Sequence, residues 1–381
     1  MKKLITLILI FTLTLTLFCA CSSSEKEEPP KKEAETNEGE TLKYVDTGFS
    51  YCSGKVYFIS PTWSSVIESY DVESGECEEV YSDPNVTYNA DGSFSYEKLY
   101  AEFGSICACE AGGELILIAT GYERFDPEDG QDDSYFIKLI NVDRNEERDL
   151  YTDSSAHPSQ IMTYGDLLIY EPYGEYEHSE YFIYDMASDG EPEKLDLIGK
   201  DAKGVFISCI VDGKIYVGAD DSEVYEYDIA SKESRLIDEM CEYPCMVKDG
   251  KLFYLLFEDE GDSTPDLMVE ELDTGKATLL LENTGGCVGG QINDMLTGGK
   301  IYMLIPGGSK GYDGLSGVDP ATNEITQIID GEEYCVSWVK SVTDKYVVFS
   351  GTDAGSTDLT TSRAIVFNRE DGTYTEVKCA N

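Results

Sequence analysis

Short β-type runs recur along the whole chain, and each of them follows a tight-turn signal. Six copies begin with glycine and one begins with aspartate, at 54–58, 113–117, 165–169, 213–217, 250–254, 299–303 and 344–348. A second pattern, a β-rich run that ends in an Asp or Asn turn, follows each first one, as at 70–75 and 227–231. Asp and Asn favour such turns because the side chain can bond the backbone two residues further on. The chain therefore repeats one small β unit.

Each unit is expected to hold four short antiparallel strands, called A to D here in chain order. The clearest unit places them at 205–211, 214–218, 224–228 and 234–237. Seven copies over 44–381 leave about 48 residues per unit, and four strands in 40–50 residues are typical of a β-propeller. Runs such as 167–170 are apolar on both faces, as blades packed on both sides require. We predict an all-β, seven-bladed β-propeller of four-stranded antiparallel blades, or eight blades if 82–103 hides a degenerate unit.

The repeat resembles that of extracytoplasmic bacterial propellers of unknown function, whose domains are named for the low-density-lipoprotein-receptor-related propeller. These propellers are kin to pyrroloquinoline-quinone-type and WD-like repeats, and the units at 213–231 and 250–275 carry the likeness best. The resemblance covers 44–381 and implies the fold. It implies little about function, because propellers host many functions.

The N-terminal segment has the pattern of an export signal. Lys2 and Lys3 precede an uncharged apolar and Thr-rich run at 4–18, which is shorter than the ~20 residues of a membrane span. Ala20-Cys21 then resembles the end of a bacterial lipoprotein signal, where a small residue stands before an acylated Cys. The resemblance implies that 1–20 is a signal peptide and that Cys21 carries lipid. Phe18 departs from the usual Leu, so an ordinary secretory signal or an uncleaved anchor stays open.

Residues 21–43 are expected to form a disordered polar tether behind the acylated Cys. The stretch 22–42 carries almost no apolar side chain and contains Pro29-Pro30. About 20 residues reach roughly 70 Å when fully extended. We therefore expect a propeller at 44–381 on the extracytoplasmic face of the cell membrane, held there by its lipid.

Strand order decides which connections share an end of the propeller. The A–B and C–D turns emerge at one end and are tight, whereas B–C and D–A connections emerge at the other. The long segments are nearly all of the second kind, at 60–66, 82–103, 119–134, 171–179, 258–265, 306–314 and 351–361. Loops on a rigid scaffold are the usual place for recognition. The predicted ligand-binding residues are the aromatics in the B–C loops of blades 1–3: Trp63, Tyr122, Phe125, Tyr173 and Tyr176. The alternative interpretation is that each of these rings covers the hydrophobic core at the end of its blade.

The charge balance excludes one class of partner. The chain has 28 Lys+Arg against 75 Asp+Glu, a formal net charge of −47. Such a surface repels phosphate backbones, so we expect no nucleic acid partner.

Candidate chemistry is sparse. The only two histidines, His157 and His178, exclude most His-dependent catalysis. The match to G-x-S-x-G at 307–311 lacks the strand–turn–helix context and the later His of a hydrolase. The acidic loops at 126–133 and 258–262 could hold Ca²⁺, but solvated loops explain them equally. We expect no catalytic residue, no metal and no cofactor.

Twelve cysteines are many for an exported chain. Cys19 and Cys21 belong to the N-terminal segment, which leaves ten. Several fall at predicted A-strand positions, namely Cys52, Cys107, Cys109, Cys209, Cys245 and Cys335. Small apolar side chains fit the crowded centre of a propeller, so most are expected to be buried thiols. Disulfides stay open, with Cys241 and Cys245 as the nearest local candidates.

These observations favour a lipid-anchored, non-enzymatic module that binds or scaffolds an envelope protein or glycan through the loop face of blades 1–3. We expect a monomer. The alternative is an extracellular carbohydrate-active enzyme that uses a pair of carboxylates on the same face as acid and base. With 75 acidic residues, some pair is certain to occur by chance. A quinone-dependent dehydrogenase is disfavoured, because the required Ca²⁺ and cofactor constellation is not identifiable.

Overall fold

The described part of the chain is all-β. In the computed structural model it comprises residues 40–41, 48–89, 92–96, 98–125, 132–153, 160–172, 180–188, 190–198, 204–219, 223–238, 243–257, 265–282, 284, 300–307, 312–356, 358 and 361–379. The chain divides into two compact units, 1–36 and 37–381, and every described residue belongs to the second. Within these ranges no helix is long and apolar enough to cross a membrane.

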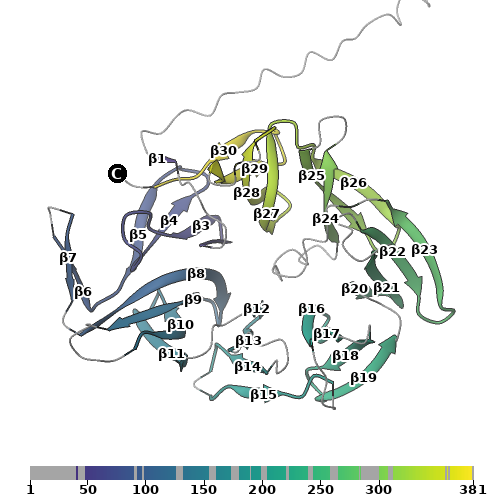
Figure 1. Ribbon diagram of the computed structural model, residues 1–381, viewed down its shortest axis with the longest axis horizontal. Helices are drawn as coiled ribbons and strands as arrows, with labels where there is room; N and C mark the ends of the chain where they lie inside the picture. Colours follow the sequence, from purple (N-terminus) through teal and green to yellow (C-terminus); the bar gives the residue numbers. More distant parts are fainter. Residues whose placement is uncertain are drawn as a thin grey trace, which may run out of the picture. The chain divides into compact units, whose positions relative to one another are not determined.

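Seven successive antiparallel sheets form the blades of a β-propeller (Figure 1). Blade 1 holds β2 (Phe49–Cys52), β3 (Lys55–Ile59), β4 (Val66–Asp71) and β5 (Cys77–Ser82), and blade 2 holds β8 (Leu99–Ala111), β9 (Glu114–Phe125), β10 (Ser134–Asn141) and β11 (Glu146–Asp153). Blade 3 holds β12 (Gln160–Tyr164), β13 (Leu167–Glu171), β14 (Tyr181–Asp185) and β15 (Glu193–Leu195). Blade 4 holds β16 (Phe206–Val211), β17 (Lys214–Ala219), β18 (Glu223–Asp228) and β19 (Glu233–Asp238).

The remaining blades follow the same order. Blade 5 holds β20 (Tyr243–Lys248), β21 (Lys251–Leu256), β22 (Asp266–Glu271) and β23 (Lys276–Leu281), and blade 7 holds β27 (Tyr334–Val342), β28 (Tyr346–Asp353), β29 (Arg363–Asn368) and β30 (Tyr374–Glu376). Blade 6 shows β24 (Ile301–Gly307), β25 (Tyr312–Asp319) and β26 (Glu324–Ile329), and residues 285–299 before β24 lie outside the described part. Two small pairs complete the fold: the hairpin β6 (Val86–Tyr88) with β7 (Phe94–Tyr96), and β1 (Glu40–Thr41) with β31 (Lys378–Cys379).

The tight turns have the chemistry that the repeat predicts. In the C–D turn of blade 1, Asp71 Oδ1 accepts the N–H groups of Glu73 (3.0 Å) and Ser74 (2.8 Å). Asp228 and Asp319 accept the equivalent pairs in blades 4 and 6. In blade 4 the A–B turn needs a positive φ at both central residues, and Asp-Gly supplies it with φ of 51° and 77° at 212–213. Side-chain bonding and glycine thus fix the turns locally.

The two kinds of tight turn are also bonded to each other. In six blades an N–H just after strand C donates to a carbonyl at or beside the A–B turn: Val72 to Gly54, Val142 to Leu115, Met186 to Asp166, Ile229 to Gly213, Leu272 to Gly250 and Arg369 to Lys345, at 2.8–3.1 Å. One end of the propeller is therefore built from short, mutually bonded turns, and the longer connections emerge at the other end, as predicted.

Apolar packing joins each blade to the next around the ring. Buried side chains of blades 2 and 3 form one cluster through Ile118 and Leu168, and Phe49 of blade 1 shares a cluster with Val348 of blade 7. Inner strands such as β16 and β17 are mostly buried, whereas outer strands such as β23 are mostly exposed. The blades are therefore held by burial on both faces.

These observations confirm the seven-bladed, all-β prediction. The strands of blade 4 start and end within one residue of the predicted bounds. The segment 82–103 forms the end of β5, the two-stranded hairpin β6–β7 and the start of β8, with no further blade among its described residues. The six cysteines predicted on A strands all lie on the first strand of a blade: Cys52, Cys107, Cys109, Cys209, Cys245 and Cys335.

Candidate interaction surface

Trp63 lies in the B–C loop of blade 1, at the end opposite the tight turns. Ser60 N–H donates to the carbonyl of Val66 (2.8 Å), and Val66 N–H donates to the carbonyl of Trp63 (3.0 Å). These bonds close the loop, so the half-buried indole is held in place. The centroid of its ring is 4.9 Å from that of Tyr88 and 6.0 Å from that of Phe94. Trp63 therefore joins an aromatic group supplied by the hairpin β6–β7.

The hairpin extends this group towards blade 2. Phe94 is 41% exposed, and its ring centroid lies 5.4 Å from that of Tyr100 on β8. Tyr96 lies 4.7 Å from the same Tyr100 ring. The Tyr88 hydroxyl is 2.6 Å from Ser65 Oγ, which ties the hairpin to the loop of blade 1. Tilted and edge-to-face pairs of this kind are favourable beyond their burial.

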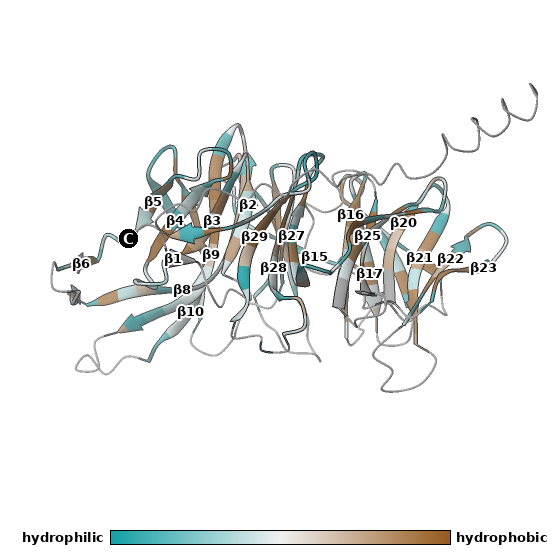
Figure 2. Ribbon diagram, turned by 90° about the horizontal axis from the view of Figure 1, so that it is seen from above, coloured by the Kyte–Doolittle hydropathy of each residue, from teal (hydrophilic) through white to brown (hydrophobic). Residues whose placement is uncertain are grey.

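Blade 2 continues the aromatic row on its first three strands. β8 and β9 are 13 and 12 residues long, and Figure 2 shows β8 and β10 reaching towards β6. Tyr100 pairs with Arg124 and Glu102 pairs with Tyr122 between β8 and β9, and Tyr122 pairs with Tyr135 of β10. Paired residues and residues two apart project from the same face of a sheet. All five side chains therefore share one face.

Arg124 organises the polar part of this face. Its guanidinium lies 4.6 Å from the centre of the Tyr122 ring, donates from Nε to Glu102 (2.6 Å) and donates from Nη1 to Asp133 (2.5 Å). The hydrogen bond from Arg124 holds the pKa of the Asp133 carboxyl below its usual range. The Tyr122 hydroxyl donates to that of Tyr135 (3.1 Å), and this bond, together with burial, raises the pKa of Tyr122. The face thus presents flat rings and a cation already neutralised by two acids.

We call this set of side chains the aromatic surface. Its members are Trp63, Tyr88, Phe94, Tyr96, Tyr100, Tyr122, Arg124 and Tyr135.

A β-bulge sets the direction of the ends of β8 and β9 that carry the aromatic surface. The register between β8 and β9 shifts at Gly104, so Phe103 and Ile106 both face the core shared with blade 1 although they are three residues apart. Gly121 lies opposite the bulge, and a Cβ there would stand 2.0 Å from the carbonyl oxygen of Glu102. The backbones therefore approach closely, and only glycine fits. This contact fixes the strands that carry the aromatic surface.

The edge of β8 is occupied. The carboxylate of Asp83, only 3% exposed, accepts the N–H of Ala101 (2.5 Å) and both the backbone and side-chain N–H of Asn85 (2.9 and 3.0 Å). The Ser64 carbonyl accepts the N–H of Phe103 (2.8 Å). Because these N–H groups already have acceptors, a partner would dock on the faces of the rings rather than add a strand to β8 at these positions.

The structure brings two of the predicted binding residues together and separates a third. Trp63 and Tyr122 both belong to the aromatic surface. The expected loop at 119–134 is strand up to Phe125 and again from Ser134, so Tyr122 and Phe125 lie on β9. Three residues apart on a strand, they project from opposite faces, and Phe125 is outside the aromatic surface. Tyr173, Tyr176 and Cys21 lie outside the described residues.

Sequence reasoning missed Tyr100 and Tyr135. The signal was present as alternation, because Tyr100 stands two residues before Glu102 and Tyr122 stands two residues before Arg124. This alternation is typical of a strand with one patterned face. It was not used, because Tyr100, Tyr122 and Arg124 fell in segments expected to be connections; Tyr135 follows the expected connection at 119–134 and was not considered as a surface residue.

Metal and hydrolase chemistry find no support in the described ranges. There, no group of three or more His, Cys, Asp or Glu converges as metal ligands would. Of the acidic loop at 126–133 only Asp132 and Asp133 are described, and 258–262, His157 and His178 lie outside. Gly307 ends β24, and the rest of the G-x-S-x-G match also lies outside.

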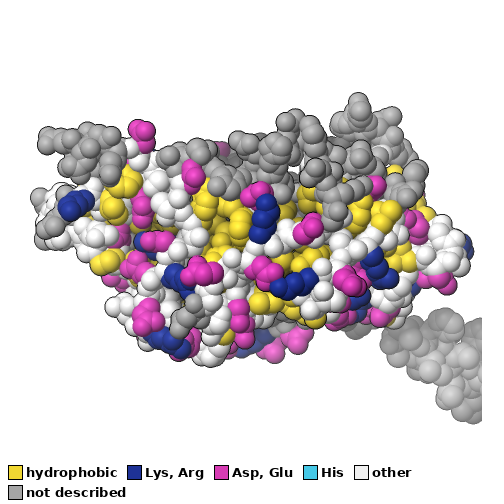
Figure 3. All heavy atoms as spheres, turned by 90° about the horizontal axis from the view of Figure 1, so that it is seen from below, with side chains coloured by type: hydrophobic (Ala, Val, Ile, Leu, Met, Phe, Trp, Pro, Cys, Tyr) yellow, Lys and Arg dark blue, Asp and Glu magenta, His cyan; other side chains and the backbone are white. Residues whose placement is uncertain are grey.

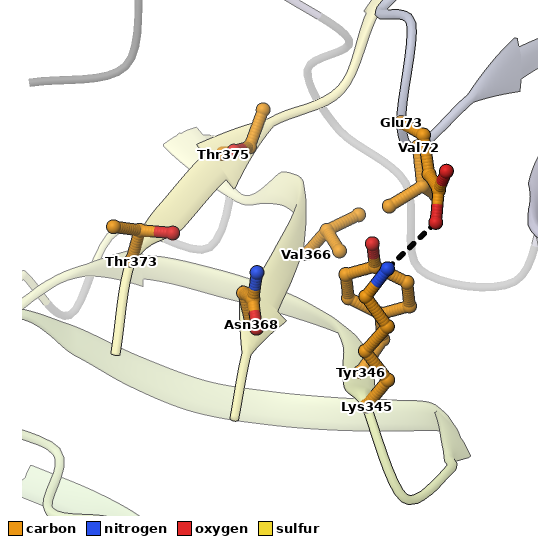
Figure 4. A pocket seen from close by; sticks show the side chains of 8 residues that line it. All are labelled: Val72, Glu73, Lys345, Tyr346, Val366, Asn368, Thr373 and Thr375. Atoms are coloured by element: carbon orange, nitrogen blue, oxygen red, sulfur yellow. Dashed lines mark hydrogen bonds and ion pairs between the residues drawn. The ribbon is translucent and has the colours of Figure 1, made fainter. Parts of the chain in front are cut away.

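A concave region occurs at the tight-turn end, between blades 7 and 1. This hollow has a volume of about 290 Å³, and Lys345 Nζ lies 2.6 Å from Glu73 across the two blades. Figure 4 shows the side chains that line it, with Lys345 and Glu73 facing each other. An adjoining hollow of about 430 Å³ shares Glu73, Lys345 and Tyr346 with it. Both are small and polar at the rim. The ion pair joins the two blades across the junction, but both side chains are exposed, so it adds little to the stability of the ring.

The comparisons show the fold. No protein-family model matches the chain, and no curated protein matches it. A solved prolyl endopeptidase matches 88% of this chain with 11% identity and a TM-score of 0.52; the match covers 49% of that chain, so this chain spans about half its length. The β-propeller domain of the trilobed protease from Pyrococcus furiosus matches with 15% identity over 74% of this chain and 86% of that chain, with a TM-score of 0.48. A putative TolB from Agrobacterium tumefaciens matches with 16% identity over 64% of this chain and 87% of that chain, with a TM-score of 0.44. At this identity the likeness to the endopeptidase shows a shared fold and nothing about activity, while the likeness to the low-density-lipoprotein-receptor-related repeat stays a prediction.

Proposed function

We propose that the protein is a lipid-anchored, extracytoplasmic propeller that binds a partner protein of the cell envelope through the aromatic surface, without catalysing a reaction. The observation that carries the proposal is the row of partly exposed rings from Trp63 on blade 1 to Tyr135 on blade 2, in which Arg124 joins the rings up to Tyr100 to the pair Tyr122–Tyr135. Tyrosine, tryptophan and arginine are the side chains enriched in protein interfaces and their hot spots.

The aromatic surface is rigid before any partner binds. Its rings lie on paired strands, on a bonded hairpin and in a closed loop, and Arg124 is fixed by two carboxylates. Ordering such groups on binding would otherwise cost free energy for each immobilised side chain. A preorganised surface therefore supports recognition, and its position at the end with the longer connections agrees with that role.

Charge favours a basic protein over other envelope partners. The formal net charge of −47 makes the field around the molecule strongly negative, which steers cationic partners towards it and repels anionic polymers. Figure 3 shows acidic side chains spread over the face drawn there, with Lys and Arg beside them. A protein with a basic rim around an apolar centre would complement the aromatic surface. A neutral glycan, which can also stack on aromatic rings, is the outcome that the experiment below distinguishes.

The same geometry argues against an acid–base pair on this surface. A catalytic acid needs a raised pKa, whereas the pKa of Asp133 is lowered by Arg124, and Glu102 bonds the same guanidinium. Glu123 does have a raised pKa, first because it is buried, but it projects from the opposite face of β9. The carbohydrate-active alternative therefore receives no support from these carboxylates.

The proposal is tested with the Trp63→Ala/Tyr122→Ala double variant of the full chain in proteoliposomes. Wild-type protein captures its partner from envelope extract, and the purified partner is then titrated against both forms. Loss of two anchors should weaken binding by about 2 kcal/mol or more, roughly 30-fold in Kd. Because both side chains are half-exposed, the melting temperature should fall by no more than about 3 °C.

Trp338→Ala is the matched control, because Trp338 is the other tryptophan, is 42% exposed and lies on β27 of blade 7. It should bind like wild type. Unchanged affinity of the double variant would overturn the choice of surface. Loss of capture after enzymatic removal of glycans from the extract would replace the protein partner by a glycan.

A further inference from the structure

The ring closes between blade 7 and blade 1 without a shared strand. Every described blade consists of strands that are consecutive in the chain, so no blade contains strands from both ends. Instead, the segment after β30 crosses to blade 1, where β31 pairs with β1 (Figure 1). Val377 and Cys379 of this segment are buried against Phe49, Val56 and Tyr70 of blade 1. This short C-terminal segment therefore adds to the direct packing of blade 7 on blade 1.

Two cysteines meet at this closure. Cys77 begins β5 of blade 1, and its Sγ donates to the carbonyl oxygen of Lys378 at 2.5 Å. Standard peptide geometry places the Cα of the next residue, Cys379, ~2.8 Å from that oxygen, so the sulfur of Cys77 is within roughly 5 Å of that Cα. Cys77 packs against the same apolar cluster that contains Cys379, which is 6% exposed. Both side chains therefore belong to one apolar cluster, and the sulfur of Cys77 lies close to the backbone of Cys379.

We infer that Cys77 and Cys379 form a disulfide that closes the propeller ring. The inference does not depend on what the aromatic surface binds. In the present structure both residues are thiols, as are the other six described cysteines. Those six lie on the first strands of blades, a placement that the sequence predicted for packing reasons. Cys77 and Cys379 are the described cysteines off those strands, and they lie together although they are far apart in the chain.

The bond forms by two thiol–disulfide exchanges with a low-molecular-weight disulfide, RSSR. Cys77, the more exposed of the two, attacks as thiolate, makes a mixed disulfide and expels RS⁻. Cys379 then loses its proton and attacks the Cys77 sulfur, which makes the protein disulfide and expels the second RS⁻. Two electrons pass from the protein to RSSR, and the two released protons convert both RS⁻ ions to RSH.

The surroundings make this exchange slow and its product durable. Burial raises the pKa of the Cys77 thiol to about 11, and Glu68 and Cys379 add to the effect. Little thiolate is therefore present at neutral pH, and the attack should accelerate as the pH rises. The same burial hides the product from reductants. The strand β31 is two residues long and pairs with β1 over two residues only, so few backbone bonds oppose the small shift that brings the sulfurs to bonding distance.

The disulfide is tested on the full chain in membranes after incubation with oxidised glutathione. Trypsin leaves Cys77 as the single cysteine of peptide 56–98 and Cys379 in the C-terminal peptide 379–381. Mass spectrometry without reductant should find these two peptides linked, and reductant should separate them. Closing so long a loop should raise the melting temperature by about 5 °C, and reductant should remove the increase.

Three variants decide the assignment. Cys77→Ser and Cys379→Ser should each abolish the linked peptide and the response of the melting temperature to reductant. Cys335→Ser, which changes a partly exposed cysteine of blade 7, should retain both. Recovery of Cys77 and Cys379 as separate alkylated peptides from the oxidised wild-type protein would overturn the inference. So would a peptide that joins Cys77 to any other cysteine. The peptide map of the wild-type chain decides even if a variant fails to fold.

Discussion

At the scale of single residues, scarce cations are shared among abundant acids. The chain has 28 Lys+Arg against 75 Asp+Glu, and some cations contact two carboxylates each. Arg124 bonds Glu102 and Asp133, and Lys138 bonds Glu147 and Asp149. Each shared cation offsets repulsion that a chain of this charge would otherwise suffer. Glu226 shows the opposite arrangement. This carboxylate is 5% exposed and receives bonds from two cations.

Replacement of Glu226 should destabilise blade 4. Its carboxylate accepts from Lys214 (2.6 Å), from Arg235 (2.9 and 3.1 Å) and from the hydroxyl of Tyr216 (3.1 Å). Glu226→Gln removes the charge that satisfies these donors, so the free energy of unfolding should fall by about 2 kcal/mol at pH 7. Urea unfolding measures the loss. Glu233→Gln, on the exposed start of β19, is the control and should change little.

The comparison of wild type with Glu226→Gln also gives a prediction about the pH dependence of stability. Burial alone would raise the pKa of Glu226, but the bonds from Arg235 and Lys214 outweigh it, so the pKa is lowered. A carboxylate with a lowered folded-state pKa stabilises above its unfolded pKa of about 4.3 and loses that contribution as the pH falls through the folded value. The difference between wild type and Glu226→Gln should therefore be constant from pH 6 to 8 and shrink below about pH 4. A difference that grows on acidification would contradict the assignment.

At the scale of elements, the sequence predicts the turns and strands that local side-chain chemistry determines. It does not predict the strand ends that depend on pairing with another strand. The Asp and Gly turns at 71–75 and 212–213 follow from side-chain bonding and φ alone, so blade 4 was placed within one residue. The extended ends of β8 and β9 depend on a bulge at Gly104 and on pairing with β10, and the alternation within each segment does not by itself show that the two segments pair. This is why Tyr100, Tyr122 and Arg124, which lie on these two strands, were expected on connections and why Phe125 was grouped with Tyr122.

Gly121→Ala tests whether the close approach of β8 and β9 at the bulge holds the extended ends of these strands in place. The new Cβ would lie 2.0 Å from the Glu102 carbonyl oxygen, a backbone atom that cannot rotate away. The paired strands must separate locally, and the free energy of unfolding should fall by about 2 kcal/mol or more. Gly104→Ala is the matched control across the bulge, because its Cβ would meet nothing nearer than 3.7 Å and should be tolerated. Thermal melting of both variants checks this, and equal losses would refute the steric argument.

At the scale of the whole molecule, seven blades follow from the repeat, whereas the closure does not. Repetition at about 48 residues is visible in the sequence and predicts stacking of each blade on the next. Cys77 and Cys379 meet only because the ring brings blade 7 to blade 1, so no local spacing could pair them. The sequence instead pointed to Cys241 and Cys245; Cys245 is a thiol on β20, and Cys241 lies outside the described residues.

The last prediction concerns the cellular location of the protein. Ala20-Cys21 after an uncharged run, followed by a polar stretch at 22–42, predicts removal of 1–20 and acylation of Cys21. Cys21→Ser removes the only sulfur that the lipid could use at this position, so the protein should shift from the membrane fraction to the medium or accumulate as an unprocessed precursor of higher mass. Fractionation with gel mobility measures both outcomes. Cys19→Ser is the control and should leave fractionation unchanged, because Phe18 before it is too large for the cleavage site. If Cys21→Ser fractionates and migrates like wild type, the propeller is held at the membrane by something other than a lipid on Cys21.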